Sequence, residues 1–198
     1  MLNSQYTDDR IEAGCDEAGR GALAGPLFAA AVILPKNYTH PLLTDSKQLT
    51  RTRRESLRTE VEREALAYAV SRIGVETIDE INILRASFLG MEQAVQKLIP
   101  VPELLLIDGN RFHTTLEIPY HCLVKGDARF LSIAAASVLA KTYRDEWMEQ
   151  LHADFPLYAW NENKGYPTPS HHEAIALYGI TPHHRRSFRL ERQLKILF

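Results

Sequence analysis

The sequence predicts one domain of the α/β or α+β class, built around a mixed β-sheet. Short apolar runs of strand length occur early and in the middle of the chain, and helical patterns dominate its later part. Gly and Pro residues separate these segments. The length of 198 residues fits a single domain, 1–198, in which about 180–198 form a small helical extension.

Four segments have the composition expected of strands, namely 11–15, 27–34, 104–108 and 119–124. The run at 104–108 is apolar up to its last residue, which indicates a parallel strand buried on both faces. Residues 66–73 either extend the preceding helix or form a further strand, and periodicity alone leaves both possibilities open.

Periodic apolar residues and end signals predict the helices. Thr50 is placed to cap the first helix, and Gly179 to end the fourth. Residues 156–169 form an aromatic and Pro-rich loop. Five helices are expected, at 51–64, from Thr77 to the Pro100 region, from Asp127 to about Phe155, at 170–178 and at about 187–197.

Composition excludes several classes of protein. With 45% hydrophobic and 24% charged residues, the chain resembles an ordinary soluble domain. The N-terminus lacks the regions of a signal peptide, and the longest apolar run, 27–34, is far shorter than the ~20 residues of a membrane helix. Cys15 and Cys122 have no metal-ligand spacing, and Cys15 is expected to be a small buried residue. A reduced, cytoplasmic setting is expected.

Carboxylates lie at or just beyond three of the expected strand ends. Asp16 and Glu17 follow the first strand, Asp108 ends the apolar run, and Asp127 opens the long helix. Clustered carboxylates repel one another and resist joint ionisation, but Mg²⁺ or Mn²⁺ can neutralise them. The pattern therefore predicts metal-assisted attack on a phosphodiester.

The Asp16-Glu17 pair needs a separate argument, because successive strand residues point to opposite faces. In a regular strand only one of the two side chains could reach the cluster. Asp16 is the expected ligand, and Glu17 requires the strand to bend, which the nearby glycines permit. The alternative for this pair is two exposed acids at a strand end.

The net charge of −2 argues at first against a polyanionic partner, but the charges are unevenly distributed. The stretch 183–198 has five Lys and Arg residues against one acid, and Arg51, Arg53 and Arg54 form a second basic cluster. Such patches can bind phosphates even on a nearly neutral chain. Composition alone leaves open the alternative that both are solvated helix faces.

The loop Gly19-Arg20-Gly21 offers exposed backbone groups and one guanidinium. These groups suit hydrogen bonding to a sugar hydroxyl and a phosphate, although an ordinary turn is the alternative. Tyr166 precedes Pro167, which restrains it to an extended conformation. A rigid aromatic ring is a good sensor of a ribose 2′-hydroxyl, the alternative being a loop tyrosine packed on the core.

Seven motifs occur in the order found in ribonuclease HII, and together they span about residues 11–190. The resemblance is to the short bacterial form of that family. The motifs are Asp16-Glu17-Ala18-Gly19-Arg20-Gly21, Asp45-Ser46-Lys47, Ile107-Asp108-Gly109-Asn110, Lys125-Gly126-Asp127, Ala134-Ala135-Ala136-Ser137 with Lys141, Lys164-Gly165-Tyr166-Pro167-Thr168, and His183-His184-Arg185-Arg186-Ser187-Phe188.

This resemblance implies a ribonuclease H-like fold, a central mixed five-stranded sheet flanked by helices, with 66–73 as one of its strands. It also implies endonucleolytic cleavage of the RNA strand in RNA–DNA hybrids, and cutting 5′ of single ribonucleotides embedded in duplex DNA. The metal-binding and catalytic carboxylates implied are Asp16, Glu17, Asp108 and Asp127, with two Mg²⁺ or Mn²⁺ ions. Gly19, Arg20 and Gly21 would contact the ribose 2′-hydroxyl, and Tyr166 would pack on the sugar.

Further polar residues are candidate contacts to the substrate backbone. Ser137 and Lys141 lie one helical turn apart, so they can address the same phosphate region. Lys47, Lys164 and Arg185 are the other candidates, and surface cations are the alternative. Hydrolysis by metal ions leaves a 3′-hydroxyl and a 5′-phosphate and needs no catalytic histidine pair. His183 and His184 are therefore expected to be structural or phosphate-facing.

The last six residues, Gln193-Leu194-Lys195-Ile196-Leu197-Phe198, resemble peptides that dock in the groove of a bacterial sliding clamp. Packing of these side chains on the domain is the alternative. A monomer is the default expectation. The other functions considered are a junction resolvase with the same fold, which would need no 2′-hydroxyl sensor, and a catalytically silent hybrid-binding module.

Overall fold

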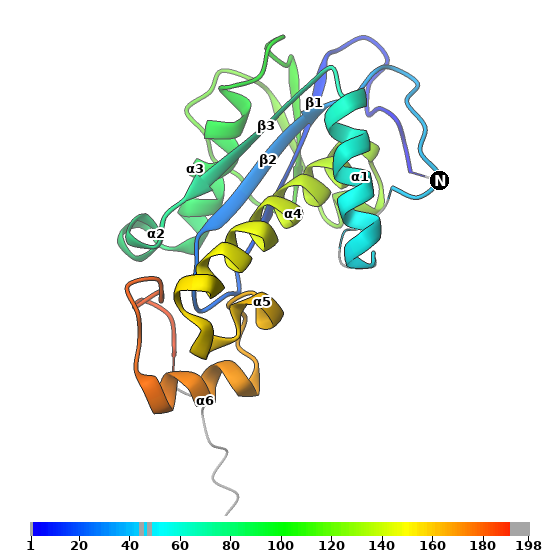
Figure 1. Ribbon diagram of the computed structural model, residues 1–198. Helices are drawn as coiled ribbons and strands as arrows, with labels where there is room; N and C mark the ends of the chain where they lie inside the picture. The colour runs from blue at the N-terminus through cyan, green and yellow to red at the C-terminus, as the bar shows by residue number, and fades with distance from the viewer. Residues whose placement is uncertain (1, 44–45, 47–48, 191–198) are drawn as a thin grey trace, which may run out of the picture.

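The computed structural model describes residues 2–43, 46 and 49–190. Its centre is a five-stranded sheet with the order β3-β2-β1-β4-β5 (Figure 1). The first three strands pair antiparallel, and β4 pairs parallel with both β1 and β5. The strands are β1 (Glu12–Ala18), β2 (Leu27–Ile33), β3 (Ala67–Ile73), β4 (Leu104–Asp108) and β5 (Tyr120–Leu123). This arrangement confirms the mixed sheet and the strand expected at 66–73.

Helices cover both faces of the sheet (Figure 1). The long helix α4 crosses β1 and β2 with α1 beside it, whereas α3 packs on β2 and β3 from the other face. The helices are α1 (Arg51–Glu64), α2 (Val75–Ile81), α3 (Ile83–Val95), α4 (Leu131–Asp154), α5 (Trp160–Asn163) and α6 (Pro169–Tyr178), and the short 3₁₀ turns are η2 (Gly126–Ala128) and η3 (Pro156–Tyr158).

Small residues let α4 approach β1 closely. A side chain at Gly14 would overlap the backbone of Ser132 and Ile133 in the first turn of α4. The run Ala134–Ala135–Ala136 is completely buried against the same face of the sheet. These small residues allow close packing, and the packing fixes α4 against the strand that holds Asp16.

Two helix boundaries differ from the sequence prediction. The expected single helix from Thr77 is two helices, because Asn82 has a φ of 66° and its side chain accepts hydrogen bonds from the N–H groups of Leu84 and Arg85. Asp127 lies in η2, and α4 begins only at Leu131. Thr50 does cap α1, as expected, by accepting a hydrogen bond from the Arg53 N–H.

The helix expected at about 187–197 is not found in 187–190, the part of that range that the structure describes. Residues 187–190 form a turn followed by irregular chain, and 191–198 lie outside the described residues. The Asp79 carboxylate accepts hydrogen bonds from the backbone N–H groups of Arg186 and Ser187. Those bonds fasten this segment to α2. Among the described residues, no helix is long and apolar enough to cross a membrane.

Candidate active site

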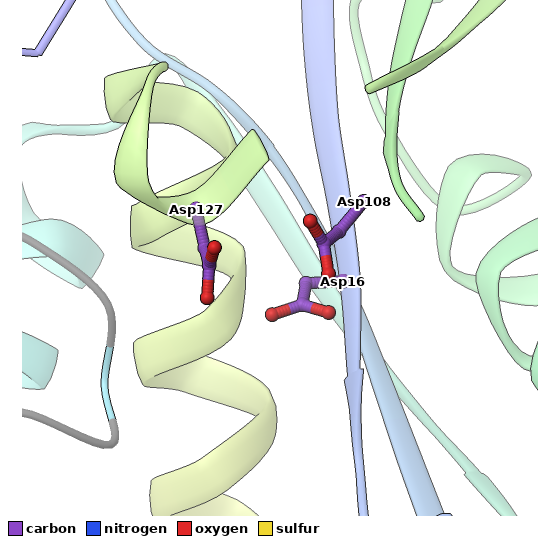
Figure 2. Close-up of side chains that lie close together, drawn as sticks. All are labelled: Asp16, Asp108 and Asp127. Carbon is purple, nitrogen blue, oxygen red and sulfur yellow. The ribbon is translucent and has the colours of Figure 1, made fainter. Parts of the chain in front are cut away.

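Three aspartates from separate parts of the chain meet at one edge of the sheet. Asp16 is on β1, Asp108 ends β4, and Asp127 lies in η2 just before α4. One carboxylate oxygen from each lies within 4.8 Å of the other two. Figure 2 shows the three side chains pointing toward a common space between the helical segment and the strands. Among the described residues, this is the group of acidic side chains arranged to hold a metal ion.

Strand alternation brings Asp16 and Asp108 together. Asp16 shares a face of β1 with Gly14, and Asp108 shares a face of β4 with Leu106, and α4 covers that face. The parallel pairing of β1 with β4 places the ends of both strands at the same edge. The prediction of a carboxylate cluster at the sheet edge is therefore confirmed for these two residues.

The backbone before α4 brings in the third carboxylate. Lys125 has a left-handed conformation with a φ of 54°, which turns the chain toward β4. The Gly126 N–H then donates a 2.8 Å hydrogen bond to Oδ1 of Asp108. A side chain at Gly126 would lie 2.6 Å from Cδ1 of Ile133 and 3.4 Å from the same oxygen, so a larger residue there would have to displace the Ile133 side chain. Asp127 follows directly and is 5% exposed.

The electrostatics of the three aspartates favour a bound cation. Asp16 is 5% exposed, and burial raises its pKa well above the ordinary value, with further increases from the charges of Glu17 and Asp108. Hydrogen bonds from Ser137 and from the Glu17 N–H act in the opposite direction. Three hard oxygen donors, two of them buried and that of Asp108 partly exposed, fit Mg²⁺ or Mn²⁺, because a divalent ion removes the repulsion that opposes their ionisation.

Glu17 lies outside this group of three. β1 stays regular through Ala18, so the Glu17 side chain points to the opposite face from Asp16. Its Oε1 accepts a 3.1 Å hydrogen bond from Nη1 of Arg20 and forms an ion pair with it. Glu17 nevertheless borders the same cavity as Asp16 and Asp108.

A cavity of about 420 Å³ opens over the aspartates. Its walls combine the loop after β1, the face of α4 that follows Ser137, and the ring of Tyr166. The residues that line it are Asp16, Glu17, Ala18, Gly19, Arg20, Gly21, Ser46, Asp108, Ser137, Lys141 and Tyr166. The structure thus places six of the nine residues predicted to bind substrate around the expected metal ligands: Gly19, Arg20, Gly21, Ser137, Lys141 and Tyr166.

Lys141 is the cation that faces this cavity from α4. Its Nζ donates a 2.5 Å hydrogen bond to Oδ1 of Asp145 and lies 5.8 Å from the centre of the Tyr166 ring. Burial lowers the pKa of Lys141, and the carboxylate of Asp145 opposes that change. Asp145 therefore helps to keep Lys141 charged beside the cavity.

Two predicted phosphate contacts are buried instead. Lys164 is 9% exposed, and its Nζ donates hydrogen bonds to Glu149 and to the Asn161 carbonyl. Arg185 is completely buried and donates to backbone carbonyls, so its guanidinium cannot reach a phosphate. Neighbouring segments cover both side chains, and neither residue borders the cavity over the aspartates. Lys47 lies outside the described residues.

The histidine pair has a structural environment, as expected. His184 is 1% exposed, and its Nε2 lies 3.2 Å from Nε2 of His171. His183 packs its ring against Phe155 and Trp160. Neither histidine borders the cavity over the aspartates.

The basic cluster at the start of α1 faces a different cavity. This cavity of about 290 Å³ lies between α1 and α4, and acids of both helices border it. Arg51 forms ion pairs with Glu55 and Glu149, and Arg54 donates to the carbonyls of Ser46 and Leu49. These two arginines join elements of the fold.

Sequence reasoning missed Ser46 and Arg144 as parts of the site. The Ser46 hydroxyl lies 2.9 Å from that of Ser137, and Ser46 belongs to one of the seven motifs, which was a usable signal. Arg144 is completely buried beside Tyr166, and nothing in the local sequence distinguishes it from the exposed arginines.

Comparison with known proteins agrees with this geometry. A family model described as Ribonuclease HII matches residues 13–191. The protein is 58% identical to a Ribonuclease HII of Porphyromonas gingivalis over 190 residues, which cover 96% of this chain and 94% of that one. It is also 58% identical to a Ribonuclease HII of Bacteroides thetaiotaomicron, with full coverage of both chains.

Solved structures show the same fold. Ribonuclease H2 from Pyrococcus horikoshii OT3 superposes with a TM-score of 0.75 and 27% identity, covering 90% of this chain and 94% of that one. The structure of the PCNA:RNase HII complex from Archaeoglobus fulgidus gives a TM-score of 0.75 and 25% identity, with coverage of 93% and 98%. From the carboxylate cluster, the surrounding motifs and these similarities, the chain belongs to the ribonuclease HII family, metal-dependent endoribonucleases that degrade the RNA of RNA–DNA hybrids.

Proposed function

We propose that this protein cuts the phosphodiester on the 5′ side of a ribonucleotide, both within hybrids and at a single ribonucleotide embedded in duplex DNA. One observation carries the proposal. The oxygens of Asp16, Asp108 and Asp127 lie within 4.8 Å of one another at a cavity that Gly19-Arg20-Gly21 and Tyr166 also border. A metal site beside groups suited to a ribose 2′-hydroxyl would couple hydrolysis to recognition of RNA.

The aspartates would hold two divalent ions, with Glu17 placed at the border of the cavity to contribute a further oxygen. When bound, such ions lower the pKa of an attacking water and stabilise the departing 3′-oxygen. Products would carry a 3′-hydroxyl and a 5′-phosphate. The raised pKa of Asp16 supports a site whose acids ionise together only when cations neutralise them.

The remaining groups of the cavity would bind and orient the substrate. Lys141, fixed by Asp145, presents its ammonium group to a phosphate. The side chain of Arg20 is 51% exposed, so it can reach the substrate backbone. Tyr166 is held extended by Pro167 and can pack against a sugar, while the backbone of Gly19 to Gly21 offers hydrogen bonds to the 2′-hydroxyl.

Three labelled duplexes would test this function in Mg²⁺ and in Mn²⁺. One is all DNA, one contains a single ribonucleotide, and one is an RNA–DNA hybrid. Asp108→Asn removes one proposed ligand, and Asp154→Asn, at the exposed end of α4, is the matched control. We expect cutting 5′ of the lone ribonucleotide, lost in Asp108→Asn and kept in Asp154→Asn.

Other outcomes would favour different functions. Cutting of the long hybrid alone would remove the junction-sensing role from Tyr166. Cutting of the all-DNA duplex at a rate equal to the ribonucleotide duplex would indicate a DNA nuclease such as a junction resolvase. Binding without cleavage of either ribonucleotide substrate would make a silent hybrid-binding module the better description.

Docking on a sliding clamp through residues 193–198 is also proposed for this chain. The segment lies outside the described residues. Support comes from its apolar sequence and from the solved complex of an archaeal RNase HII with PCNA.

A further inference from the structure

Two arginines are completely buried behind the cavity that borders the aspartates. Arg144 lies on α4, and Arg185 lies in the segment after α6. Among the described residues, neither guanidinium forms a salt bridge with a carboxylate. Burying a charge without an ionic partner is unfavourable unless hydrogen bonds replace those lost to water. The hydrogen bonds of these two side chains therefore show which parts of the fold they connect.

Arg144 joins α4 to two loops at once. Its Nε donates to the Pro26 carbonyl at 3.0 Å, and Nη2 donates to the Ala24 carbonyl at 3.2 Å. Its Nη1 donates to the Lys164 carbonyl at 2.9 Å. The first two acceptors belong to the loop between β1 and β2, and the third lies two residues before Tyr166.

Arg185 fastens the same β1–β2 loop from another side. Its Nε and Nη2 both donate to the Gly25 carbonyl, at 3.0 and 2.8 Å, and Nη1 donates to the Arg20 carbonyl at 3.1 Å. The Arg20 carbonyl is part of the Gly19-Arg20-Gly21 loop. The two arginines thus form hydrogen bonds with both ends of the segment from 20 to 26.

The two loops also touch each other directly. The Leu23 N–H donates a 2.7 Å hydrogen bond to the Gly165 carbonyl, immediately before Tyr166. Gly165 has a φ of 78°, and a side chain there would lie 2.5 Å from the Ala24 carbonyl oxygen. This contact between the 19–26 loop and the 164–166 loop has no room for even one methyl group.

Arg144 also lies against the Tyr166 ring. The Arg144 guanidinium carbon is 5.2 Å from the centre of the Tyr166 ring, a distance suited to a cation–π contact. Burial, together with the positive charge of Arg144, lowers the pKa of Arg185 to about 9. Their hydrogen bonds all go to backbone carbonyls, which are partial negative charges of the loops themselves.

We propose that Arg144 and Arg185 are positioning residues that set the spacing between the Gly19–Gly21 backbone and the Tyr166 ring, and thereby the selectivity for a ribonucleotide. The inference rests on the proposed function. A 2′-hydroxyl can be sensed from both sides of a sugar only when the two contact groups keep a fixed separation. Displacements of about 1 Å in such a site can lower the rate on the order of 10²-fold.

Charge-conserving variants test the geometry rather than the charge. Arg144→Lys and Arg185→Lys keep a cation but lose the planar fork that reaches several carbonyls. We expect kcat on the single-ribonucleotide duplex to fall about 10- to 100-fold with little change in KM. We also expect a smaller kcat/KM ratio between that duplex and one with a 2′-fluoro nucleotide at the same place. Mn²⁺ binding measured by calorimetry should stay unchanged.

A second variant reaches the same contact without altering a buried charge. Gly165→Ala forces the two loops apart, because the new methyl group meets the Ala24 carbonyl. Gly179→Ala is the matched control, since Gly179 has the same φ of 78° but open space around it. We expect Gly165→Ala to lose ribonucleotide selectivity and Gly179→Ala to keep it.

Three results would overturn the inference. The first is unchanged selectivity in folded lysine variants and in Gly165→Ala, with a selective wild-type enzyme. The second is an equal loss in Gly165→Ala and Gly179→Ala, which would point to backbone strain alone. The third is a wild-type enzyme that binds Mn²⁺ but does not cut at ribonucleotides, which would remove the proposed function as well.

Discussion

A cluster of acids and a pair of buried arginines lie on two sides of the cavity, and the fold treats these two sets of charges in opposite ways. On one side, Asp16, Asp108 and Asp127 bring their oxygens within 4.8 Å of one another, and repulsion contributes to the raised pKa of Asp16. On the other side, Arg144 and Arg185 are fully buried, and backbone carbonyls accept hydrogen bonds from both. The acids remain available to an added cation, whereas the arginines have their partners within the chain.

The carboxylates are suited to bind metal ions, whereas the arginines are suited to hold the surrounding loops in place. A carboxylate group that repels its neighbours is less stable alone but binds metal ions well, because binding removes the repulsion. A guanidinium whose donors are satisfied by the backbone adds rigidity and offers nothing to a ligand. Variants of the carboxylates should therefore change mainly the activity, and variants of the arginines should change mainly the stability.

The largest effect is expected from Asp108→Asn. Loss of one ligand should reduce cleavage on the order of 10³-fold or more, because the ions supply several kcal/mol of transition-state stabilisation. The same variant should unfold at a higher temperature than wild type in metal-free buffer, since one repelling charge is gone. Cleavage assays and thermal unfolding in EDTA measure the two effects. Retained cleavage would contradict the metal site, and lower metal-free stability would contradict the repulsion.

The converse is expected for Arg144→Met. The carbonyls of Ala24, Pro26 and Lys164 would lose a donor, at about 1–3 kcal/mol for each buried group left unsatisfied. Denaturant unfolding should therefore show a loss of several kcal/mol. Arg58→Met is the control, because Arg58 is partly exposed and its ion pairs with Glu62 and Glu146 should contribute about 1 kcal/mol or less. Equal losses in the two variants would refute the distinction.

The pH dependence of stability should reveal the histidines beneath the Tyr166 loop. Nε2 of His171 accepts from Trp160 at 3.1 Å and lies 3.2 Å from His184, whose Nδ1 accepts from the Thr181 N–H, so both rings are neutral. Burial and the neighbouring His171 lower the pKa of His184 to about 4. Below about pH 6.5 the histidines of the unfolded chain bind protons, whereas the buried rings of the folded protein stay neutral. The free energy of unfolding should therefore fall between pH 6.5 and about 4.

A comparison with His184→Gln isolates this contribution. The raised pKa of Asp16 acts in the opposite direction, because the folded protein takes up a proton there more readily than the unfolded chain. The difference between wild type and His184→Gln, measured by denaturant unfolding from pH 7.5 to 4.5, cancels that effect. We expect the difference to shrink as the pH falls, and a constant difference would argue against neutral histidines.

The smallest effect on cleavage is expected from deletion of residues 193–198. If this segment docks on a sliding clamp, cleavage should stay within about 2-fold of wild type while clamp binding is lost. Pull-down with purified clamp and the single-ribonucleotide assay measure the two properties. Loss of folding after the deletion would instead show that the segment packs on the domain.

Local sequence patterns were sufficient to predict most strands of the sheet and the positions of the carboxylates at strand ends. The apolar run at 104–108 and its terminal Asp108 were predicted correctly because strand burial and strand ends leave marks within a few residues. Asn82 was harder to predict, since the hydrophobic period continues past it while its backbone turns with a φ of 66°. The same limitation placed the start of α4 too early, at Asp127 instead of Leu131.

The sequence by itself determined which residues are candidates for the chemistry of the site. The carboxylates at strand ends, the Gly-Arg-Gly loop and the Gly-Tyr-Pro turn can each be recognised within a short segment. Only the tertiary structure decided which cations face the cavity over the aspartates. Lys141 borders the cavity, while Lys164 and Arg185 are covered by segments distant in sequence. Burial depends on what packs over a side chain, and no local pattern records that. The hydrogen bonds by which Arg144 and Arg185 hold the 19–26 and 164–166 loops therefore became visible only in three dimensions.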